Sequence, residues 1–456
     1  MEETKKGSGT TDLTVGRPLP QILKFALPLV LGTLFQQLYS FVDTVIVGRC
    51  LGTDALGAVG TTYSLNFLIL GFVLGSCTGF GIPVAQSFGA RDSEDMHKYL
   101  FNGAVLCVVL SVVFTIVTTL TAAPLLQLIH TPAELFPDAV AYIRIIFLGI
   151  PATVLFNYTS TVLHSLGDSQ HPFYFLLISS FLNIGLDWLF IVPLGMGVEG
   201  AAIATVISQA ISALLCVRYI RHSQVLIITK EDWKVDWQCC KVLLGMGLPT
   251  GLQYSITAIG SIMLQTGING LGSHAVAAVS TGNKVTQLIC CPLDALGTTV
   301  ATYGGQNIGA KKLDRISKGM RTCVAFGLIY SVIAFFLIKY FGPTLLSLFI
   351  GAEETSVLAD AQYFIMHWVA FCAPLTFVYV FRFMIQGLGF SKLAVFAGVF
   401  EMLARGLISL FWIPAAGFEA VCFASPVAWI AADVFLVPAY LWVRKKLHRE
   451  FGVTAD

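Results

Sequence analysis

Long apolar stretches follow one another along almost the whole chain and leave only short polar segments between them. A hydrophobic run of about 20 residues is long enough to cross the hydrocarbon core of a bilayer as a helix. Windows of about 19 residues predict about twelve such spans. The runs far exceed the roughly ten residues of a barrel strand, so we expect an all-α membrane protein. The approximate ranges are 22–47, 57–83, 100–123, 139–163, 172–193, 198–219, 243–270, 278–303, 320–342, 358–386, 393–414 and 419–443.

The composition agrees with this reading. Of the 456 residues, 56% are hydrophobic and 12% are charged, against about 25% charged in an average soluble domain. The net charge of +1 gives no sign of a nucleic-acid partner, and we expect none. The eleven cysteines show no CxxC spacing, so we interpret them as small buried hydrophobes and predict neither a zinc site nor a disulfide framework.

Basic residues gather in every second loop between the spans, and the alternate loops carry almost none, with Arg49 as the exception. Because such residues stay on the cytoplasmic side, we predict a multi-pass plasma-membrane protein with both termini in the cytoplasm. The basic loop residues include Arg17, Lys24, Arg91, Lys98, Arg218, Arg221, Lys241, Lys311, Lys312, Arg315, Lys318, Arg321, Arg444, Lys445, Lys446 and Arg449.

The chain contains an internal repeat. LGTDALGAVGT, from Leu51, resembles LGSHAVAAVST, which starts 220 residues later at Leu271. QSFGAR from Gln86 and QNIGAK from Gln306 show the same offset. Each half holds six spans, and an even number makes both halves enter the membrane from the same side. We therefore expect two six-helix lobes around a central cavity, related by a pseudo-twofold axis along the membrane normal.

We place the first lobe at residues 1–222. The second lobe, residues 223–456, would begin with the loop that connects the halves.

One ionisable side chain, Asp43, lies within the first predicted span. An Asp near a span centre costs roughly 2.5–3.5 kcal/mol on insertion scales, so it is a functional-site hypothesis. The alternative is a carboxylate at the interface, one turn short of the span's end. Gln36 and Tyr39 precede it by seven and four residues and share its helix face.

Asn183 and Asp187 are four residues apart and share one face of the fifth span. Asp187 lies ~9 Å from the outer end of its helix, and Thr205 of the sixth span lies at a similar depth. Together with Asp43 they can form a cage of hard oxygen ligands that suits Na⁺, or the two carboxyl groups can carry a proton. A polar network that only specifies helix packing is the structural alternative. Apolar residues stand at the equivalent places of the second half, namely Met263 or Leu264, Ala404 and Ile408.

The second half has intramembrane polar groups of its own. Asp294 lies near the middle of the eighth span with no partner evident in the sequence. Glu401 and Arg405, four residues apart, are interpreted either as a structural ion pair or, with Asp294, as a second-lobe site. Arg382 is near enough to a span end for its charged group to reach the interface.

The ordered set of motifs resembles the multidrug and toxic-compound extrusion (MATE) transporters over essentially the whole chain. It comprises FVDT at the end of the first span, Q-x-x-G-A-[RK] in both halves and N-x-x-x-D in the fifth span. The last pair is similar to the DinF-type and archaeal branch, which implies a first-lobe cation site of Asp43, Asn183, Asp187 and Thr205. The resemblance also implies that Tyr142 and Asn157 belong to the surrounding network. The NorM-like branch has an acidic residue in the seventh span, and LPTGLQYSITAIGSIMLQTG has none.

The resemblance implies a secondary active antiporter that exports amphipathic or cationic organic compounds by alternating access, driven by Na⁺ or H⁺. Pro28 interrupts the hydrogen bonds of the first span, so we expect a hinge there. We expect small organic substrates, contact with membrane lipid, function as a monomer and no cofactor other than the coupling ion. No G-x-x-x-x-G-K-[ST] motif occurs. The alternative is a flippase for lipid-linked oligosaccharide or peptidoglycan precursors; an enzyme is not expected, because no HExxH or GxSxG motif occurs.

Overall fold

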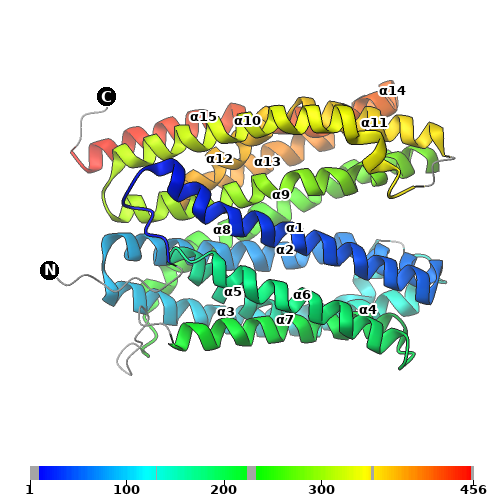
Figure 1. Ribbon diagram of the computed structural model, residues 1–456, viewed down its shortest axis with the longest axis horizontal. Helices are drawn as coiled ribbons and strands as arrows, with labels where there is room; N and C mark the ends of the chain where they lie inside the picture. The colour runs from blue at the N-terminus through cyan, green and yellow to red at the C-terminus, as the bar shows by residue number, and fades with distance from the viewer. Residues whose placement is uncertain (1–9, 130, 223–232, 351–353, 453–456) are drawn as a thin grey trace. The chain divides into compact units, whose positions relative to one another are not determined.

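A computed structural model describes residues 10–129, 131–222, 233–350 and 354–452, and within these ranges the regular structure is helical, with no strand. The predicted all-α class is therefore confirmed. The helices are shown in Figure 1. Their bounds are α1 (Pro18–Leu51), α2 (Thr53–Ala90), α3 (Ser93–Leu128), α4 (Phe136–Leu148), α5 (Ile150–Ser165), α6 (Gln170–Ile191), α7 (Gly197–His222), α8 (Trp237–Asn269), α9 (Ser273–Gly309), α10 (Leu313–Leu346), α11 (Thr355–Ala370), α12 (Cys372–Gly387), α13 (Ser391–Leu407), η2 (Ile408–Trp412), α14 (Ile413–Ala416) and α15 (Phe418–Glu450).

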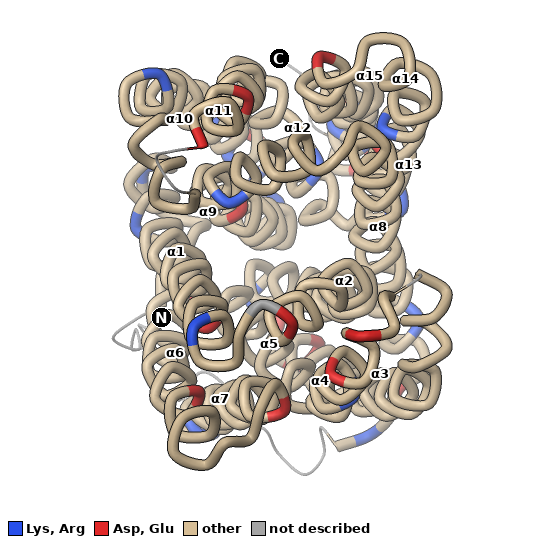
Figure 2. Tube along the Cα trace, turned by 90° about the vertical axis from the view of Figure 1, so that its right-hand side faces the viewer, with Lys and Arg blue, Asp and Glu red and all other residues tan. Residues whose placement is uncertain are grey.

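Most helices are long and apolar enough to cross a membrane. Among the described residues nine helices meet this test alone, and up to eleven spans result when each of two bent pairs counts as one. Most of the trace is uncharged, as the tan colour in Figure 2 shows. The remaining predicted span, 278–303, lies in α9, whose buried residues recur from Ala275 to Ile308. Because α10, α11 and α12 pack around α9, its many polar and small side chains are shielded.

The fourth and tenth predicted spans are each broken into two helices. The chain bends by 46° between α4 and α5 and by 50° between α11 and α12. Pro151 and Pro374 lie in the first turn of the second helix of each pair, where a missing N–H group weakens the continuation of the first helix. A Cβ atom on Gly149 would meet Val206 Cγ2 at 2.3 Å, so the first bend lies directly against α7.

The chain divides into two compact units. Unit 1 contains Lys24–Gly251 and the described residues before Leu13, and unit 2 contains Leu13–Leu23 and the residues from Leu252 onward. Residues 223–232 of the expected connecting loop lie outside the described part of the chain. The lobe boundary expected at residues 222 and 223 is not tested by this division and stays a prediction.

The segment before α1, residues 13–16, is held within unit 2 and is called the α1 leader. Arg315 Nη1 donates to the Gly16 carbonyl at 2.6 Å, and Nη2 donates to the Leu13 carbonyl at 2.9 Å. Asn307 Nδ2 also donates to the Leu13 carbonyl, at 3.2 Å, and Gln306 Oε1 accepts from the Leu13 N–H at 3.0 Å. The end of α9 and the start of α10 therefore fix the start of α1.

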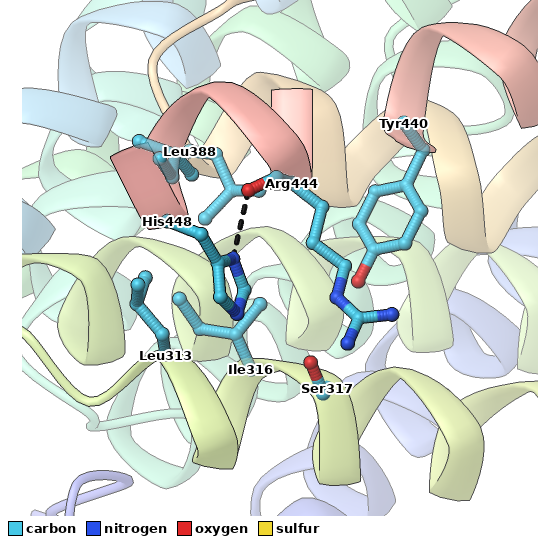
Figure 3. A pocket seen from close by; sticks show the side chains of 8 residues that line it. Leu313, Ile316, Ser317, Leu388, Tyr440, Arg444 and His448 are labelled. Carbon is cyan, nitrogen blue, oxygen red and sulfur yellow. Dashed lines mark hydrogen bonds between the residues drawn. The ribbon is translucent and has the colours of Figure 1, made fainter. Parts of the chain in front are cut away.

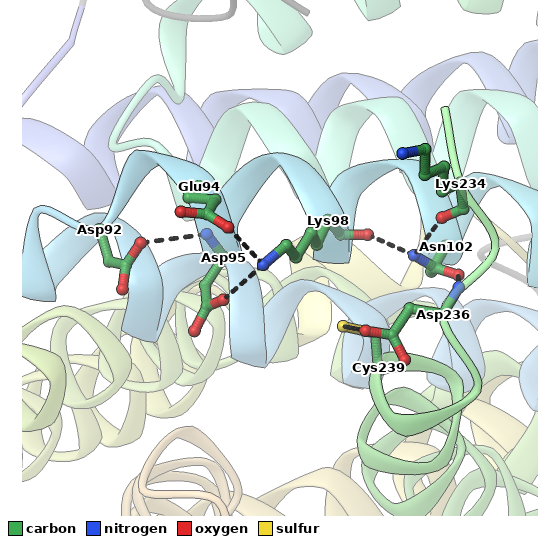
Figure 4. A network of polar contacts seen from close by, with 8 residues as sticks. All are labelled: Asp92, Glu94, Asp95, Lys98, Asn102, Lys234, Asp236 and Cys239. Carbon is green, nitrogen blue, oxygen red and sulfur yellow. Dashed lines mark hydrogen bonds and ion pairs between the residues drawn. The ribbon is translucent and has the colours of Figure 1, made fainter. Parts of the chain in front are cut away.

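The segment before α8, residues 234–236, is held within unit 1 and is called the α8 leader (Figure 4). Asn102 of α3 is fully buried; its Oδ1 accepts from the Asp236 N–H at 2.9 Å and its Nδ2 donates to the Lys234 carbonyl at 3.4 Å. Asp236 Oδ1 accepts from the Gln238 N–H at 2.8 Å and caps the start of α8. This backbone hydrogen bond holds the pKa of Asp236 below its usual range.

Candidate cation site

An apolar cluster in unit 1 packs the ends of α1, α4, α6 and α7 together. It includes Val47 of α1, Tyr142 of α4, Ile191 of α6 and Ala201 of α7. Asp43 and Asp187 each lie four residues before a member of this cluster, on the same face of their helices as Val47 and Ile191. The apolar packing therefore turns both carboxylates toward the middle of the helix group.

Asn183 and Asp187 project from one face of α6, where Asn183 contacts α7 and Asp187 faces Asp43 of α1. Asn183 is 2% exposed and Asp187 is fully buried. Asn183 Nδ2 donates to Thr205 Oγ1 of α7 over a long distance of 3.5 Å. This contact orients the amide so that its oxygen is turned away from the hydroxyl group.

The carboxyl groups of Asp43 and Asp187 lie within hydrogen-bonding reach of each other. An ionised carboxylate can only accept hydrogen bonds, so neither carboxylate can donate a hydrogen bond to the oxygens of the other. In the described structure Asp43 Oδ1, Asn183 Oδ1 and both carboxyl oxygens of Asp187 are buried without a hydrogen-bond partner. Buried polar atoms of this kind are rare and call for an explanation. The structure thus brings Asp43, Asn183, Asp187 and Thr205 together.

These oxygens fit a small hard cation. Two carboxylates, an amide oxygen and a hydroxyl oxygen are ligands of the kind that hard cations prefer. The described residues contain no group of three or more His, Cys, Asp or Glu side chains that could hold a metal ion. A bound Na⁺ would be held by Asp43, Asp187, Asn183 and Thr205, and a proton would instead be shared between the two carboxyl groups.

Two tyrosines border the carboxyl pair. Tyr39 of α1 and Tyr142 of α4 both lie within electrostatic reach of Asp43 and Asp187. Gln36 lies within hydrogen-bonding reach of the Tyr39 hydroxyl group. The three side chains that the sequence places around the site therefore lie beside it.

Asn157 contacts another part of unit 1. Its Nδ2 donates to the Thr153 carbonyl at 2.8 Å, within α5. The Thr153 hydroxyl group in turn donates to Gln209 Oε1 of α7. The structure thus shows a polar link between α5 and α7 that sequence reasoning missed, because its members are 56 residues apart. A role for Asn157 in the cation site stays a prediction.

The second half holds a buried ion-pair group. Arg382 of α12 donates through Nη2 to Glu401 Oε1, and Arg405 Nη2 lies 3.6 Å from Glu401 Oε2. The prediction that Arg382 reaches the interface is wrong: its side chain is only 9% exposed. A carboxylate on the neighbouring helix α13 compensates its charge inside unit 2, so the side chain has no need to extend toward water.

Asp294 has partners that the sequence did not indicate. Its carboxyl group lies within hydrogen-bonding reach of Tyr379 of α12 and within electrostatic reach of Tyr254 of α8. The same two helices are also linked by Gln386 Nε2 of α12, which donates to Gln253 Oε1 of α8 at 3.3 Å. Tyr254 also lies within electrostatic reach of Arg382, and Tyr379 within that of Arg405, so these tyrosines stand between Asp294 and the Glu401 group. A second-lobe cation site stays a prediction.

Known proteins resemble this chain in sequence and fold. The MatE family model matches residues 28–189 and again residues 249–410. The probable multidrug resistance protein YpnP of Bacillus subtilis is 31% identical over 403 residues, 88% of each chain. The FAD transporter of Shewanella oneidensis is 23% identical over 385 residues, 83% of each chain. A MOP superfamily transporter from Pyrococcus furiosus has a similar structure, with a TM-score of 0.90 and 24% identity over 99% of this chain and 100% of its own.

The two matches to one family model are of equal length and start 221 residues apart, at residues 28 and 249. They confirm the internal repeat, and together they cover most of the chain. The likeness to solved structures shows the fold, which has twelve membrane helices in two lobes. The chain belongs to the MATE family of membrane transporters.

Proposed function

We propose that the protein is a secondary active antiporter that exports amphipathic or cationic organic compounds in exchange for Na⁺ or a proton. The observation that carries this proposal is the facing pair of carboxyl groups in unit 1. Asp43 and Asp187 come from different helices, lie within reach of each other, and keep three buried oxygens without a partner. A cation or proton that enters between them removes the repulsion and satisfies these oxygens.

The coupling cation enters down its gradient and so drives the exchange. At about 100 mV, one charge that moves inward releases ~2.3 kcal/mol, enough for ~50-fold accumulation of a neutral compound. The cation binds more tightly to the conformation in which Asp43 and Asp187 are close, and the substrate binds more tightly to another conformation. These differences in affinity between the two conformations couple cation entry to substrate export. Bending of α1 at Pro28 links the site to this change, because that position lacks a helical hydrogen bond.

The names of relatives support an organic substrate, since YpnP is described as a probable multidrug resistance protein. A flippase for pyrophosphate-linked lipids needs cationic side chains for its substrate. Arg382 and Arg405 both contact Glu401, which compensates their charge and makes them poor candidates for that role. We place the monomeric chain in the plasma membrane with both termini in the cytoplasm and no cofactor.

Transport in proteoliposomes tests the proposal, with an imposed Na⁺ gradient or an imposed pH gradient, one at a time. Asp43→Asn and Asp187→Asn should each reduce gradient-driven export of a fluorescent organic cation to background. Both should retain binding of that compound to the purified protein. Asp138→Asn is the matched control, because this carboxylate is exposed in the first turn of α4. Undiminished gradient-driven export by Asp43→Asn would disprove the coupling role.

A further inference from the structure

Asp433 is an ionisable side chain near the middle of the last membrane span. It lies 15 residues after Phe418, where α15 begins, and ten residues, or ~15 Å of helix, before residue 443, where the predicted span ends. The hydrocarbon core of a bilayer is about 30 Å thick, so Asp433 is far from both of its surfaces. A carboxyl group at this depth is costly, and such groups mark places where proteins bind or conduct protons and ions.

The Asp433 carboxyl group has an oxygen without a partner. Its side chain is partly buried, and within the described structure Oδ1 is buried without a hydrogen bond. Arg382 of the neighbouring helix α12 has a matching deficit. Its Nη2 donates to Glu401, but its Nε is buried without an acceptor. Buried polar atoms of this kind are rare and call for an explanation.

The charges beside Asp433 come from α12 and α13, which both pack against α15. Asp433 lies within electrostatic reach of Arg382 and of Glu401. Arg382 attracts an ionised Asp433, and Glu401 repels it. Because Arg382 also donates to Glu401, its charge is shared between two carboxyl groups. The ionised form of Asp433 is thus only partly compensated.

The titratable groups of α11, which also packs against α15, lie near the start of that helix. Asp360 is within electrostatic reach of Cys422, and the His367 ring contacts those of Tyr363 and Phe423. Cys422 is eleven residues, or ~17 Å, from the mid-span carboxyl group. The remaining segments that pack against α15, η2 and α14, contain no titratable residue.

Toward the other end of α15 the next titratable groups are Tyr440 and Arg444. Figure 3 shows both side chains beside the first turns of α10. They are seven and eleven residues from Asp433, or ~11 and ~17 Å along the helix. Within the described part of the chain, Arg382 is therefore the cationic group that can accompany an ionised Asp433.

We propose that Asp433 is a proton-binding group that alternates between a neutral acid and a carboxylate that accepts a hydrogen bond from Arg382 Nε. Uptake of the proton forms one O–H bond on the carboxyl group, and release returns the proton to water. The proton thus decides whether Arg382 ties α15 to α12 and α13. This group is separate from the carboxyl pair of Asp43 and Asp187, and the inference does not depend on the exchange proposed above.

Chemical modification tests the proposal on the unaltered protein in liposomes. Dicyclohexylcarbodiimide is an apolar reagent that reacts with protonated carboxyl groups, and Val434, which is 70% exposed, leaves this side of α15 open to it. Peptide mass spectrometry should find an adduct on Asp433 whose yield falls as the pH rises. Glu401, ionised beside two guanidinium groups, should stay unmodified. The double variant Asp43→Asn, Asp187→Asn should form the Asp433 adduct as wild type does, so this test is independent of the proposed coupling site.

Infrared spectroscopy gives a second readout that needs no reagent access. The difference between wild type and Asp433→Asn should contain the carbonyl stretch of one protonated carboxyl group, which disappears as the pH rises. Asp433→Glu should restore this band. Glu419→Gln, an exposed position at the start of the same helix, should leave it unchanged.

An Asp433 that stays ionised as the permanent partner of Arg382 would give neither the adduct nor the infrared band at any pH at which the protein is folded. That result would overturn the proposal. An adduct and a band that do not change with pH would also overturn it, because the carboxyl group would then never release its proton.

Discussion

Arg382 of α12 and Glu401 of α13 form a buried ion pair, and Arg405 approaches the same carboxylate from one turn further along α13. One acidic side chain thus compensates two guanidinium groups. Replacing one partner of a buried ion pair lowers the free energy of unfolding by more than the pair contributes to it, because the remaining buried charge has no partner.

Glu401→Gln should therefore destabilise the protein by about 3–5 kcal/mol. Unfolding in detergent with increasing denaturant measures the change. Glu419→Gln is the control, because Glu419 is exposed at the start of α15 and its replacement should alter stability by no more than about 0.5 kcal/mol. A stability of Glu401→Gln within error of this control would show that the ion pair is dispensable.

Thr205→Val should distinguish the two coupling ions. The valine keeps the shape of the side chain and removes the neutral oxygen beside Asn183. A Na⁺ ion would lose a ligand, and we expect roughly tenfold weaker Na⁺ binding, equivalent to about 1.4 kcal/mol. Proton-driven export should change little, since the carboxyl groups of Asp43 and Asp187 remain. Na⁺-dependent thermal shifts give the affinity, and Thr121→Val on α3 serves as control; equal Na⁺ affinity in both variants would exclude Thr205 as a ligand.

Gly79→Ala should weaken the contact between α2 and the start of α8 in unit 1. A Cβ atom there would lie 2.6 Å from Gly247 Cα and 2.7 Å from the Met246 carbonyl oxygen, and neither backbone atom can move alone. We expect a loss of about 1–3 kcal/mol. Gly60→Ala on the same helix meets nothing within 4 Å and should be neutral or slightly stabilising. Thermal unfolding compares the two variants, and similar melting temperatures would contradict the close approach.

Arg315→Ala should release the α1 leader. The guanidinium group donates to the carbonyls of Leu13, Val15 and Gly16, so its loss removes three hydrogen bonds, and only the Leu13 carbonyl keeps a second donor, Asn307 Nδ2. Hydrogen–deuterium exchange should become at least tenfold faster at residues 13–16 and stay unchanged in α6. Lys318→Ala, an exposed position of the same helix, should show no such effect. Unchanged exchange at residues 13–16 in Arg315→Ala would mean that other contacts hold the leader.

The helices could be predicted because apolar runs and the repeat are properties of the linear sequence. The breaks inside the fourth and tenth spans could not, since Pro151 and Pro374 also fit a continuous helix with a mild kink. The partner of Arg382 was missed for a related reason. Glu401 is 19 residues away on another helix, and only the packing of α12 against α13 brings the two together.

The candidate site was accessible to sequence reasoning because its residues obey helical spacing. Asn183 and Asp187 are one turn apart, and the depth of Asp43 can be counted from the end of its span. The link from Thr153 to Gln209 has no such signal, since it depends on how α5 and α7 rotate about their axes. A contact between two such residues can be recognised only once the packing of the two helices is known.

The two leaders have a consequence for how the protein is made. Arg315, which donates to the Leu13 carbonyl, is synthesised 302 residues after Leu13. Asn102 likewise cannot form its hydrogen bond with the Asp236 N–H until Asp236, 134 residues later, has been synthesised. A fragment that stops after α7 would thus lack the α8 leader and would keep an α1 leader without its anchor. The α1 leader can therefore take its final place only after the start of α10 has been made.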